Sequence, residues 1–573
     1  MTKTFITDAY KKSKRDQDKI ISPEETVLRA KKQLQKSKLD ILQDVRRIDN
    51  NRLGIPVYFS LCGVDAHKRT GKRKQMGKGA DPAQAEASAI MELIERFSLY
   101  DFMQKEHHFQ AEKFRNIRSH GIGFEIISRS VHDDVDEQSP EYRFFSELPL
   151  RWTKAFDLCN DVWINVPFDW FFQINAYNGS SAGNCMEEAI IQGMSELVER
   201  HVCDVIIREK PTVHRIDLNT VDDTVAADLI QRYKQSGIQL YIYDYSIGTG
   251  IPVLGGMAYD PKTFPNTSEI VWTAGAMSDP SKALCRLLTE IAQLGGDFNT
   301  GSNYEPSGLP KLTDIHQIDE MHPNAAIIPF QSIPSLSNDN IKTEIMNYQK
   351  ALHFVFPYTF IVDLTHSDID LPACYTIMPG TRFRERSANA SVGMFTARMI
   401  TSTHLPEVAL KKLTAFEKEL PDKYYIPFYQ GMSLMDMSSY DDALNFFSVA
   451  LHREPEGEDL SGIYLYMGMC EKNSGRYQQA IENLKQADDI DSYRTDVLNL
   501  LGVCYYHCKR YQEAINCFER VIAIDPGSAM DYANLGVNYR ASGDNDKAKQ
   551  CLEKALSLDP GISFAWEHLL AMT

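Results

Sequence analysis

The sequence predicts an α+β domain of mixed sheets and helices, followed by an all-α solenoid. Three observations predict this arrangement. Residues 50–405 alternate short apolar runs with longer helical windows, and Gly, Pro and Asp separate them. Residues 424–573 repeat with a period of 34 residues. The length of 573 residues is enough for several domains.

Residues 1–50 are predicted to form a basic helical segment. Residues 1–78 contain 20 Lys and Arg against 9 Asp and Glu, although the whole chain has a formal net charge of −17. A basic segment of this kind would suit an enzyme that thiolates RNA. However, no aromatic residue lies between Lys11 and Lys38, and a solvated amphipathic helix explains the charge equally well. We therefore expect no nucleic-acid partner.

Residues 51–405 are predicted to form the catalytic core, and residues 406–423 a linker. Apolar runs predict strands at residues 55–61, 239–243, 253–259 and 359–363. Because longer helical windows separate these runs, the core is expected to combine mixed sheets with helices.

Three helical windows of the core carry a polar stripe on an otherwise apolar helix. The stripes consist of Ser88, Glu92 and Glu95; of Glu188, Gln192, Glu196 and Glu199; and of Arg286, Glu290 and Gln293. Spacings of three and four residues place each set on one helix face. Six carboxylates brought together would repel one another unless cations neutralised them. Mg²⁺ prefers hard oxygen ligands and often bridges to phosphates, which arginines can clamp.

Other interpretations of these residues are open. Each stripe taken alone could be a solvated helix face with Glu–Arg pairs. A di-iron centre would need Glu-x-x-His pairs, which these windows lack. The glycine-rich phosphate loop Gly-x-x-x-x-Gly-Lys-Ser/Thr is absent, so a nucleotide site here must be of another kind. The cluster of Cys504, His507, Cys508 and Cys517 fits no common zinc spacing, and packed thiols explain it better.

The repeats after the linker share a set of small and large residues. Gly468, Gly502 and Gly536 are 34 residues apart, and a looser unit begins around Gly431. Twelve residues after each glycine is an alanine: Ala443, Ala480, Ala514 and Ala548. Sixteen residues after each glycine is a large apolar residue: Phe447, Leu484, Phe518 and Leu552. This pattern resembles the tetratricopeptide repeat. Four repeats exceed the ~3 needed for a continuous core, so we expect a solenoid that binds proteins or peptides. Alternatively, the solenoid docks on its own catalytic domain or on a second copy.

Composition restricts the compartment. No run of ~18 apolar residues predicts a membrane helix, and the first 19 residues do not read as a secretory signal. Eleven cysteines without a Cys-x-x-Cys pair indicate reduced thiols. We expect a cytoplasmic protein with no membrane partner.

The ordered motifs of the core resemble the YcaO family. The resemblance covers roughly residues 20–400 and lies in Gly77-Lys78-Gly79, Ser88-x-x-x-Glu92-x-x-Glu95-Arg96, Ser181-Ala182-Gly183-Asn184-x-x-x-Glu188, Glu196-x-x-Glu199-Arg200 and Arg286-x-x-x-Glu290-x-x-Gln293. The resemblance implies ATP and Mg²⁺ as cofactors. It assigns the metal to Glu92, Glu95, Glu188, Glu196, Glu199 and Glu290. It assigns nucleotide binding to Lys78, Ser88, Ser181, Asn184, Gln192, Arg200, Arg286 and Gln293, and a catalytic role to Glu92, Glu199, Arg200 and Arg286.

The resemblance also implies a reaction. Enzymes of this family activate a peptide backbone amide by phosphorylating its oxygen after a nucleophile has added to the carbonyl carbon. Azoline-forming members typically end in a proline-rich tail, whereas this chain ends Leu569-Leu-Ala-Met-Thr573. We therefore expect thioamidation of a peptide or protein, with a TfuA-type partner and a homodimeric enzyme. An azoline-forming cyclodehydratase, a non-catalytic scaffold and an RNA-thiolating enzyme are the alternatives.

Overall fold

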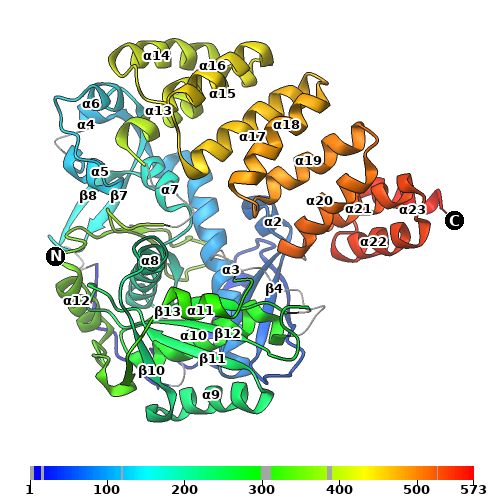
Figure 1. Ribbon diagram of the computed structural model, residues 1–573. Helices are drawn as coiled ribbons and strands as arrows, with labels where there is room; N and C mark the ends of the chain where they lie inside the picture. Colours follow the sequence, from blue (N-terminus) through cyan, green and yellow to red (C-terminus); the bar gives the residue numbers. More distant parts are fainter. Residues whose placement is uncertain are drawn as a thin grey trace. The chain divides into compact units, whose positions relative to one another are not determined.

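The computed structural model describes residues 5–14, 18–117, 120–266, 268–298, 312–383, 390–525 and 527–572. Two compact units make up the chain (Figure 1). Unit 1 comprises Met1–Asp134 and Pro149–Arg386, and unit 2 comprises Val135–Leu148 and Ser387–Thr573. Unit 1 contains mixed sheets and helices and unit 2 is helical, which confirms the predicted fold class.

The described part of unit 1 contains three main sheets and one short ribbon. The sheets are β3–β4–β5 (Leu42–Arg47, Val57–Cys62, Lys74–Lys78); β6–β7–β15–β16–β9 (Gln110–Lys113, Pro149–Asp157, Phe360–Asp363, Ala373–Ile377, Ser180–Ala182), with β8 (Val162–Pro167) beside β7; and β13–β12–β11–β10–β14 (Val271–Ala276, Val253–Tyr259, Gln239–Asp244, His214–Asp217, Ile327–Pro329). The ribbon pairs β1 (Ser13–Lys14) with β2 (Asp18–Lys19). All these pairings are antiparallel except β10–β14. The four predicted strands correspond to β4, β11, β12 and β15.

The helices of unit 1 lie between these strands. They are α1 (Pro23–Lys36), α2 (Val64–Thr70), α3 (Pro82–Gln104), α4 (Phe114–Ile117), α5 (Phe124–Ser130), α7 (Phe168–Asn175), α8 (Met186–Glu209), α9 (Thr224–Ser236), α10 (Pro280–Gly295), α11 (His316–Met321) and α12 (Ile341–Leu352). Short 3₁₀ turns are at Glu106–His108, Leu218–Thr220, Gly296–Phe298 and Phe330–Ser332. The three polar stripes lie on α3, α8 and α10.

The three stripe-bearing helices share one local plan. Each begins after a three-residue loop that follows an edge strand: β5 precedes α3, β9 precedes α8 and β13 precedes α10. Each helix packs on its own strand and on the edge strand of another sheet of unit 1, since α3 also contacts β9, α8 contacts β13 and α10 contacts β5. The contacts form a closed cycle, so the three helices are positioned against one another.

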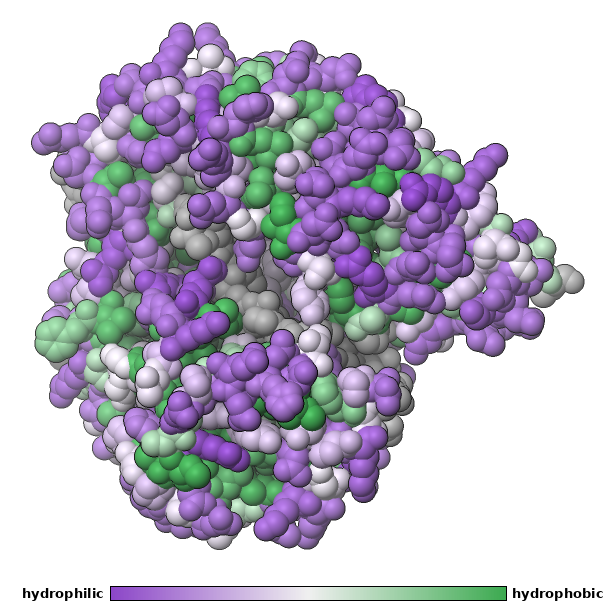
Figure 2. All heavy atoms as spheres, in the orientation of Figure 1, coloured by the Kyte–Doolittle hydropathy of each residue, from purple (hydrophilic) through white to green (hydrophobic). Residues whose placement is uncertain are grey.

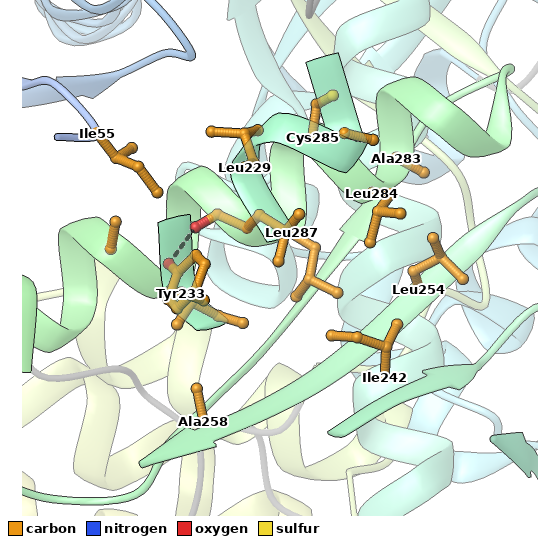
Figure 3. Packing of buried hydrophobic residues seen from close by; sticks show 14 of the residues in the cluster. Ile55, Leu229, Tyr233, Ile242, Leu254, Ala258, Ala283, Leu284, Cys285 and Leu287 are labelled. Carbon is orange, nitrogen blue, oxygen red and sulfur yellow. Dashed lines mark hydrogen bonds between the residues drawn. The ribbon is translucent and has the colours of Figure 1, made fainter. Parts of the chain in front are cut away.

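Close strand–helix packing fixes this plan. A Cβ on Gly77 of β5 would lie 2.0 Å from the Ala89 nitrogen of α3, and one on Gly275 of β13 would lie 2.7 Å from the Ala283 oxygen of α10. Around α10, the apolar core includes Leu284 and Leu287 (Figure 3). There the Tyr233 hydroxyl of α9 donates a hydrogen bond to the Leu288 carbonyl, with the oxygens 2.6 Å apart. Backbone-to-backbone packing of this kind leaves the helices little freedom to shift.

Unit 2 is a stack of helices. They are α6 (Pro140–Phe145), α13 (Val392–Thr403), α14 (Pro406–Glu419), α15 (Tyr425–Asp436), α16 (Tyr440–His452), α17 (Gly457–Asn473), α18 (Tyr477–Ile490), α19 (Thr495–His507), α20 (Tyr511–Ile524), α21 (Ala529–Ser542), α22 (Asn545–Leu558) and α23 (Ser563–Leu570). The four predicted repeats are the pairs α15–α16, α17–α18, α19–α20 and α21–α22. In each pair the predicted glycine faces the predicted large residue, as Gly502 faces the Phe518 ring.

Two features of unit 2 differ from what the sequence suggested. Residues 406–423, expected to be a linker, contain helix α14. Helix α6, from within the predicted catalytic core, packs against α13 and α14. The Phe144 and Phe416 rings stack with centroids 4.4 Å apart, and Arg143 pairs with Glu419 at 2.8 Å.

Apolar side chains are mainly inside the two units. Figure 2 shows that polar side chains cover most of the visible face and that apolar residues form small patches. Among the described residues, no helix combines the length and apolarity needed to cross a membrane. In the cysteine cluster, Cys504 and Cys517 pack in the core of the repeats, and the His507 ring stacks on Tyr477 with centroids 4.3 Å apart.

Candidate active site

The polar stripe is repeated at the same positions of α3, α8 and α10. The eleventh residue is always glutamate, and the fourteenth is Glu or Gln; the pairs are Glu92 and Glu95, Glu196 and Glu199, and Glu290 and Gln293. The seventh residues are Ser88, Gln192 and Arg286. All nine side chains are half-buried except that of Glu199, which is buried, while most of the neighbouring apolar residues are buried. Three equivalent helices therefore direct equivalent polar faces toward one region.

One part of this region surrounds Lys78 at the end of β5. Its ammonium group contacts the Glu290 carboxylate, and Glu92, Glu199, Arg200 and Arg286 all act on it electrostatically. Burial and the positive charge of Arg286 hold the pKa of Lys78 below its ordinary value, against the opposite effect of Glu199 and Glu92.

The Glu199 carboxylate links β13 to α10 in the same part of the site. It accepts hydrogen bonds from the backbone N–H of Ala276 (3.3 Å) and from Nε of Arg286 (3.1 Å). Strand β13 and helix α10 therefore both orient a carboxylate that projects from α8.

The other part surrounds Glu95. Its carboxylate accepts a hydrogen bond from the Ser180 hydroxyl at 2.7 Å and pairs with Arg96 at 3.1 Å. Burial raises the pKa of Glu95, and the nearby charges of Glu196 and Glu92 raise it further, although Arg96 opposes them. Since Glu92 acts on both Glu95 and Lys78, the two parts form one continuous site.

Glu188 occupies a separate position at the start of α8. It accepts hydrogen bonds from the backbone N–H of Ile20 (2.6 Å) and from the backbone and side-chain nitrogens of Asn184 (2.9 and 3.1 Å). In the described part of the chain, no hydrogen bond or ion pair joins Glu188 to the other five glutamates. The side-chain oxygen of Asn184 is buried and has no hydrogen-bond partner among the described residues, as expected of an atom that receives a ligand.

Some predicted residues have another local role. Ser181 is fully buried, and its hydroxyl donates to the Ala189 carbonyl at 2.6 Å, so it joins β9 to α8. Conversely, Arg96 and Ser180 contact the glutamates but were not among the predicted ligands. A signal for Arg96 was present, because Glu95-Arg96 repeats as Glu199-Arg200. Ser180 had no comparable signal.

The site's donor set suits Mg²⁺ and a nucleotide by its chemistry. Five glutamates supply hard oxygen donors, and Lys78, Arg200 and Arg286 supply groups that bind phosphate oxygens. In the described residues, however, no three His, Cys, Asp or Glu side chains are arranged with the geometry of a metal site. The carboxylates instead pair with Lys78, Arg96 and Arg286.

Similarity to known proteins agrees with this donor set. A family model described as "YcaO cyclodehydratase, ATP-ad Mg2+-binding" matches residues 76–382, more than half of the chain. A tetratricopeptide repeat model matches residues 493–560, and a model for subunit 3 of the anaphase-promoting complex, cyclosome, matches residues 436–521.

Three curated relatives share the core. An uncharacterized protein of Methanothermobacter thermautotrophicus is 24% identical over 58% of this chain and 86% of its own length. An uncharacterized protein in the tfuA 3′ region of Rhizobium leguminosarum is 25% identical over 38% of this chain and 53% of its own length. The Escherichia coli ribosomal protein S12 methylthiotransferase accessory factor YcaO is 30% identical over 53% of this chain. The chain spans about half the length of the last two relatives, since it covers 56% of the Escherichia coli protein.

A solved structure shares the fold. A heterocyclase in complex with substrate and cofactor has a TM-score of 0.52 and 20% identity, over 66% of this chain and 54% of that one. The family match also agrees with the expected cofactors, ATP and Mg²⁺. The chain therefore belongs to the YcaO family, whose ATP- and Mg²⁺-binding domain is joined here to tetratricopeptide repeats.

Proposed function

We propose that this protein uses ATP and Mg²⁺ to phosphorylate the oxygen of a peptide backbone amide, and that the product is a thioamide. The observation that carries the proposal is the threefold repetition of the glutamate stripe beside Lys78, Arg200 and Arg286. Acidic groups next to phosphate-binding cations suit phosphoryl transfer, in which the protein mainly positions charge.

The proposed roles follow from the charges. Glu92, Glu95, Glu196, Glu199 and Glu290 would hold Mg²⁺, with Glu188 as a sixth ligand at the start of α8. Bound Mg²⁺ would neutralise the oxygens of the triphosphate. Arg200 and Arg286 would bind the phosphoryl group during transfer, and Lys78 would line the phosphate site together with Ser88.

The side-chain amides complete the proposed nucleotide site. The unpaired oxygen of Asn184 would accept a hydrogen bond from the nucleotide or from a metal-bound water. Gln192 and Gln293 would contribute polar contacts from the same stripe. Ser181 would act indirectly, since its hydroxyl is engaged by the Ala189 carbonyl.

The reaction balances without a protein nucleophile. Hydrosulfide adds to the carbonyl carbon, and the oxyanion that forms takes the γ-phosphoryl group, releasing ADP. The C–O bond then breaks, phosphate leaves with both bonding electrons, and loss of a proton gives the thioamide. The cations beside the glutamates would stabilise the negative charge that develops on the oxygen.

The substrate and partners are part of the same proposal. We propose a peptide or protein substrate that the repeats recruit, a homodimeric enzyme and a TfuA-type partner that delivers sulfur. The name of the Rhizobium relative, which mentions the tfuA region, supports such a partner. If a Cys, Ser or Thr side chain of the substrate were the nucleophile instead, the product would be an azoline.

A second candidate is an accessory role in the modification of another protein, without catalysis by this chain. The printed name of the Escherichia coli relative, an accessory factor, favours it. The presence of all six expected glutamates favours catalysis, because a scaffold would have no need of them.

The test compares two substitutions on helix α8. Glu199→Gln removes the charge of a buried carboxylate that pairs with Arg286. Glu209→Gln changes an exposed residue ten positions further along the same helix. We expect Glu199→Gln to lower ATP hydrolysis by at least about a hundredfold, as removal of a group that stabilises a transition state does. Glu209→Gln should have wild-type activity.

Equal ATP hydrolysis by both variants and the wild type would contradict the enzymatic proposal and favour the accessory role. The product is identified by mass spectrometry of cellular proteins with and without this enzyme. A thioamide exchanges one oxygen for sulfur, whereas an azoline loses one water.

A further inference from the structure

We propose that Tyr177 is a positioning residue, which holds Arg96 in one orientation and thereby keeps the Glu95 carboxylate available to Mg²⁺. The inference rests on the proposed function of the glutamate site. Tyr177 lies in the loop between α7 and β9 and belongs to none of the three polar stripes.

The geometry around Arg96 carries the inference. The guanidinium carbon lies 4.1 Å from the centroid of the Tyr177 ring, which is close enough for a strong cation–π contact. On its other side, one terminal nitrogen of Arg96 lies 3.1 Å from Glu95 and 3.2 Å from the Ser180 hydroxyl. The second terminal nitrogen lies 4.0 Å from Glu92, outside hydrogen-bond distance. Arg96 therefore approaches the Glu95 carboxylate through one terminal nitrogen.

The loop around Tyr177 is held in place. The Tyr177 carbonyl accepts one hydrogen bond from the backbone N–H of Ser180 at 3.0 Å. The same carbonyl lies 2.7 Å from the Ser180 hydroxyl. The hydroxyl of Tyr375 donates to the Ala176 carbonyl at 2.9 Å. At the next turn, the Gly179 N–H donates to Glu196 at 3.2 Å, and a φ of +87° at Gly179 favours glycine there. The same loop thus orients the ring and contacts a third glutamate of the site.

The Tyr177 ring limits the orientations that the Arg96 guanidinium group can adopt. A guanidinium group forms its strongest pair with a carboxylate through two parallel hydrogen bonds. Such a bidentate pair with Glu95 would engage both carboxylate oxygens, which a metal ion would otherwise use. Contact with the Tyr177 ring, whose centroid lies 4.1 Å from the guanidinium carbon, restrains the guanidinium group and disfavours this arrangement. Without the ring, the flexible Arg96 side chain would compete with Mg²⁺, so metal affinity would fall.

The test measures metal binding directly and separately from turnover. Mn²⁺, followed by electron paramagnetic resonance, is titrated into the full-length protein with a non-hydrolysable ATP analogue present. We expect Tyr177→Leu to weaken Mn²⁺ binding about two- to fivefold, the range that a cation–π contact of this kind corresponds to. Tyr177→Phe, which keeps the ring, should retain wild-type affinity. The ring is 44% exposed, so both variants should fold, as melting temperatures would verify.

Two controls show whether the effect passes through Arg96. Tyr241→Leu removes another ring of unit 1 that stacks on an arginine, Arg215, at 4.8 Å, and should leave Mn²⁺ affinity unchanged. In an Arg96→Gln background, Tyr177→Leu should cause no further loss, because the two residues then act as one unit.

The inference is overturned if Tyr177→Leu binds Mn²⁺ like the wild type, or if it weakens binding equally in the Arg96→Gln background. If the wild type itself binds neither Mn²⁺ nor the nucleotide analogue, the proposed function and this inference both fail. Wild-type binding together with an unaffected Tyr177→Leu variant refutes only the role of Tyr177.

Discussion

Asp101, near the end of α3, shows how a single buried residue contributes to stability. Its carboxylate lies 3.2 Å from Arg69, 2.7 Å from Lys105 and 3.3 Å from His366, and the residue is 3% exposed. Burial raises the pKa of Asp101, but hydrogen bonds from His366 and Lys105 outweigh burial and lower the pKa to about 2. The folded state therefore favours the ionised carboxylate more than the unfolded state does.

Asp101→Asn should lower the free energy of unfolding at pH 7 by about 2–3 kcal/mol. This free energy corresponds to a folded-state pKa about two units below that of an unfolded Asp. Because the pKa of Asp101 is lower in the folded state, its ionised carboxylate stabilises the fold at pH values above the unfolded pKa of ~3.9. This stabilisation disappears as the pH falls toward the folded pKa of about 2. The difference between variant and wild type should thus be constant from pH 7 to about 4 and shrink below that. Urea unfolding at several pH values measures it.

A control variant shows how much stability an exposed ion pair contributes, for comparison with Asp101. Asp228→Asn breaks an exposed pair with Arg232 in α9 and should cost less than about 0.5 kcal/mol. Equal destabilisation by the two substitutions, or a difference that does not depend on pH below 4, would refute the role assigned to Asp101.

At the residue scale, the sequence predicted which side chains share a helix face, but not which of them meet across helices and loops. Helical spacing placed Glu92 and Glu95 on one face, because i, i+4 and i+7 geometry is local. The hydrogen bond from the Ile20 N–H to Glu188 depends on the path of the N-terminal segment, which local spacing does not determine. The same applies to Tyr177, whose place beside Arg96 depends on the loop between α7 and β9.

At the scale of elements, small residues decide how helices pack in unit 2. In each repeat a glycine of the first helix faces a large residue of the second, and a Cβ at Gly502 would lie 2.6 Å from the Phe518 ring. Gly462, within α17, contrasts with it. A Cβ at Gly462 would meet only Arg494, at 3.9 Å. The two glycines therefore separate the effect of packing from that of helix propensity.

Gly502→Ala should destabilise unit 2 by about 1–3 kcal/mol, because the added methyl group overfills the interface between α19 and α20. Gly462→Ala should leave stability unchanged or raise it by up to about 1 kcal/mol, because alanine favours the helix more than glycine does. Thermal unfolding followed by circular dichroism measures both. A loss of stability at Gly462 as large as that at Gly502 would show that packing against Phe518 is not the cause.

The strand–loop–helix plan of unit 1 could be predicted only in part. The Glu-x-x-Glu-Arg of the first two stripes is visible in the sequence and lies at equivalent positions of α3 and α8. The third copy is harder to recognise, since Gln293 and Leu294 replace the second glutamate and the arginine. Its relation to the others is visible only because β5, β9 and β13 are all edge strands that precede their helices by three residues.

At the scale of the whole molecule, the boundary between the units does not follow the order of the sequence. Residues Val135–Leu148 are part of unit 2 although both flanking segments belong to unit 1. All predicted site residues, from Lys78 to Gln293, belong to unit 1. Each unit has its own apolar core.

Deletion of residues 457–573 should leave nucleotide and Mn²⁺ affinity within about twofold of the wild type, because site residues and deleted helices belong to different units. This deletion keeps α13–α16, including the two helices that pack against α6. Turnover of a macromolecular substrate should fall if the repeats recruit it. A large loss of nucleotide affinity in a folded truncation would show that the repeats contribute to the site.

The sequence by itself determined the class of each unit, the repeat period and the residues of the three stripes, because periodicity and spacing are local properties of a chain. Only the tertiary structure decided which charges meet. The cycle of contacts among α3, α8, α10 and three edge strands joins distant segments, of which β5 and α10 are more than two hundred positions apart. The path of the N-terminal segment brings Ile20 to Glu188, and the loop between α7 and β9 places Tyr177 against Arg96. Such pairings arise from packing between distant segments, which no local pattern records.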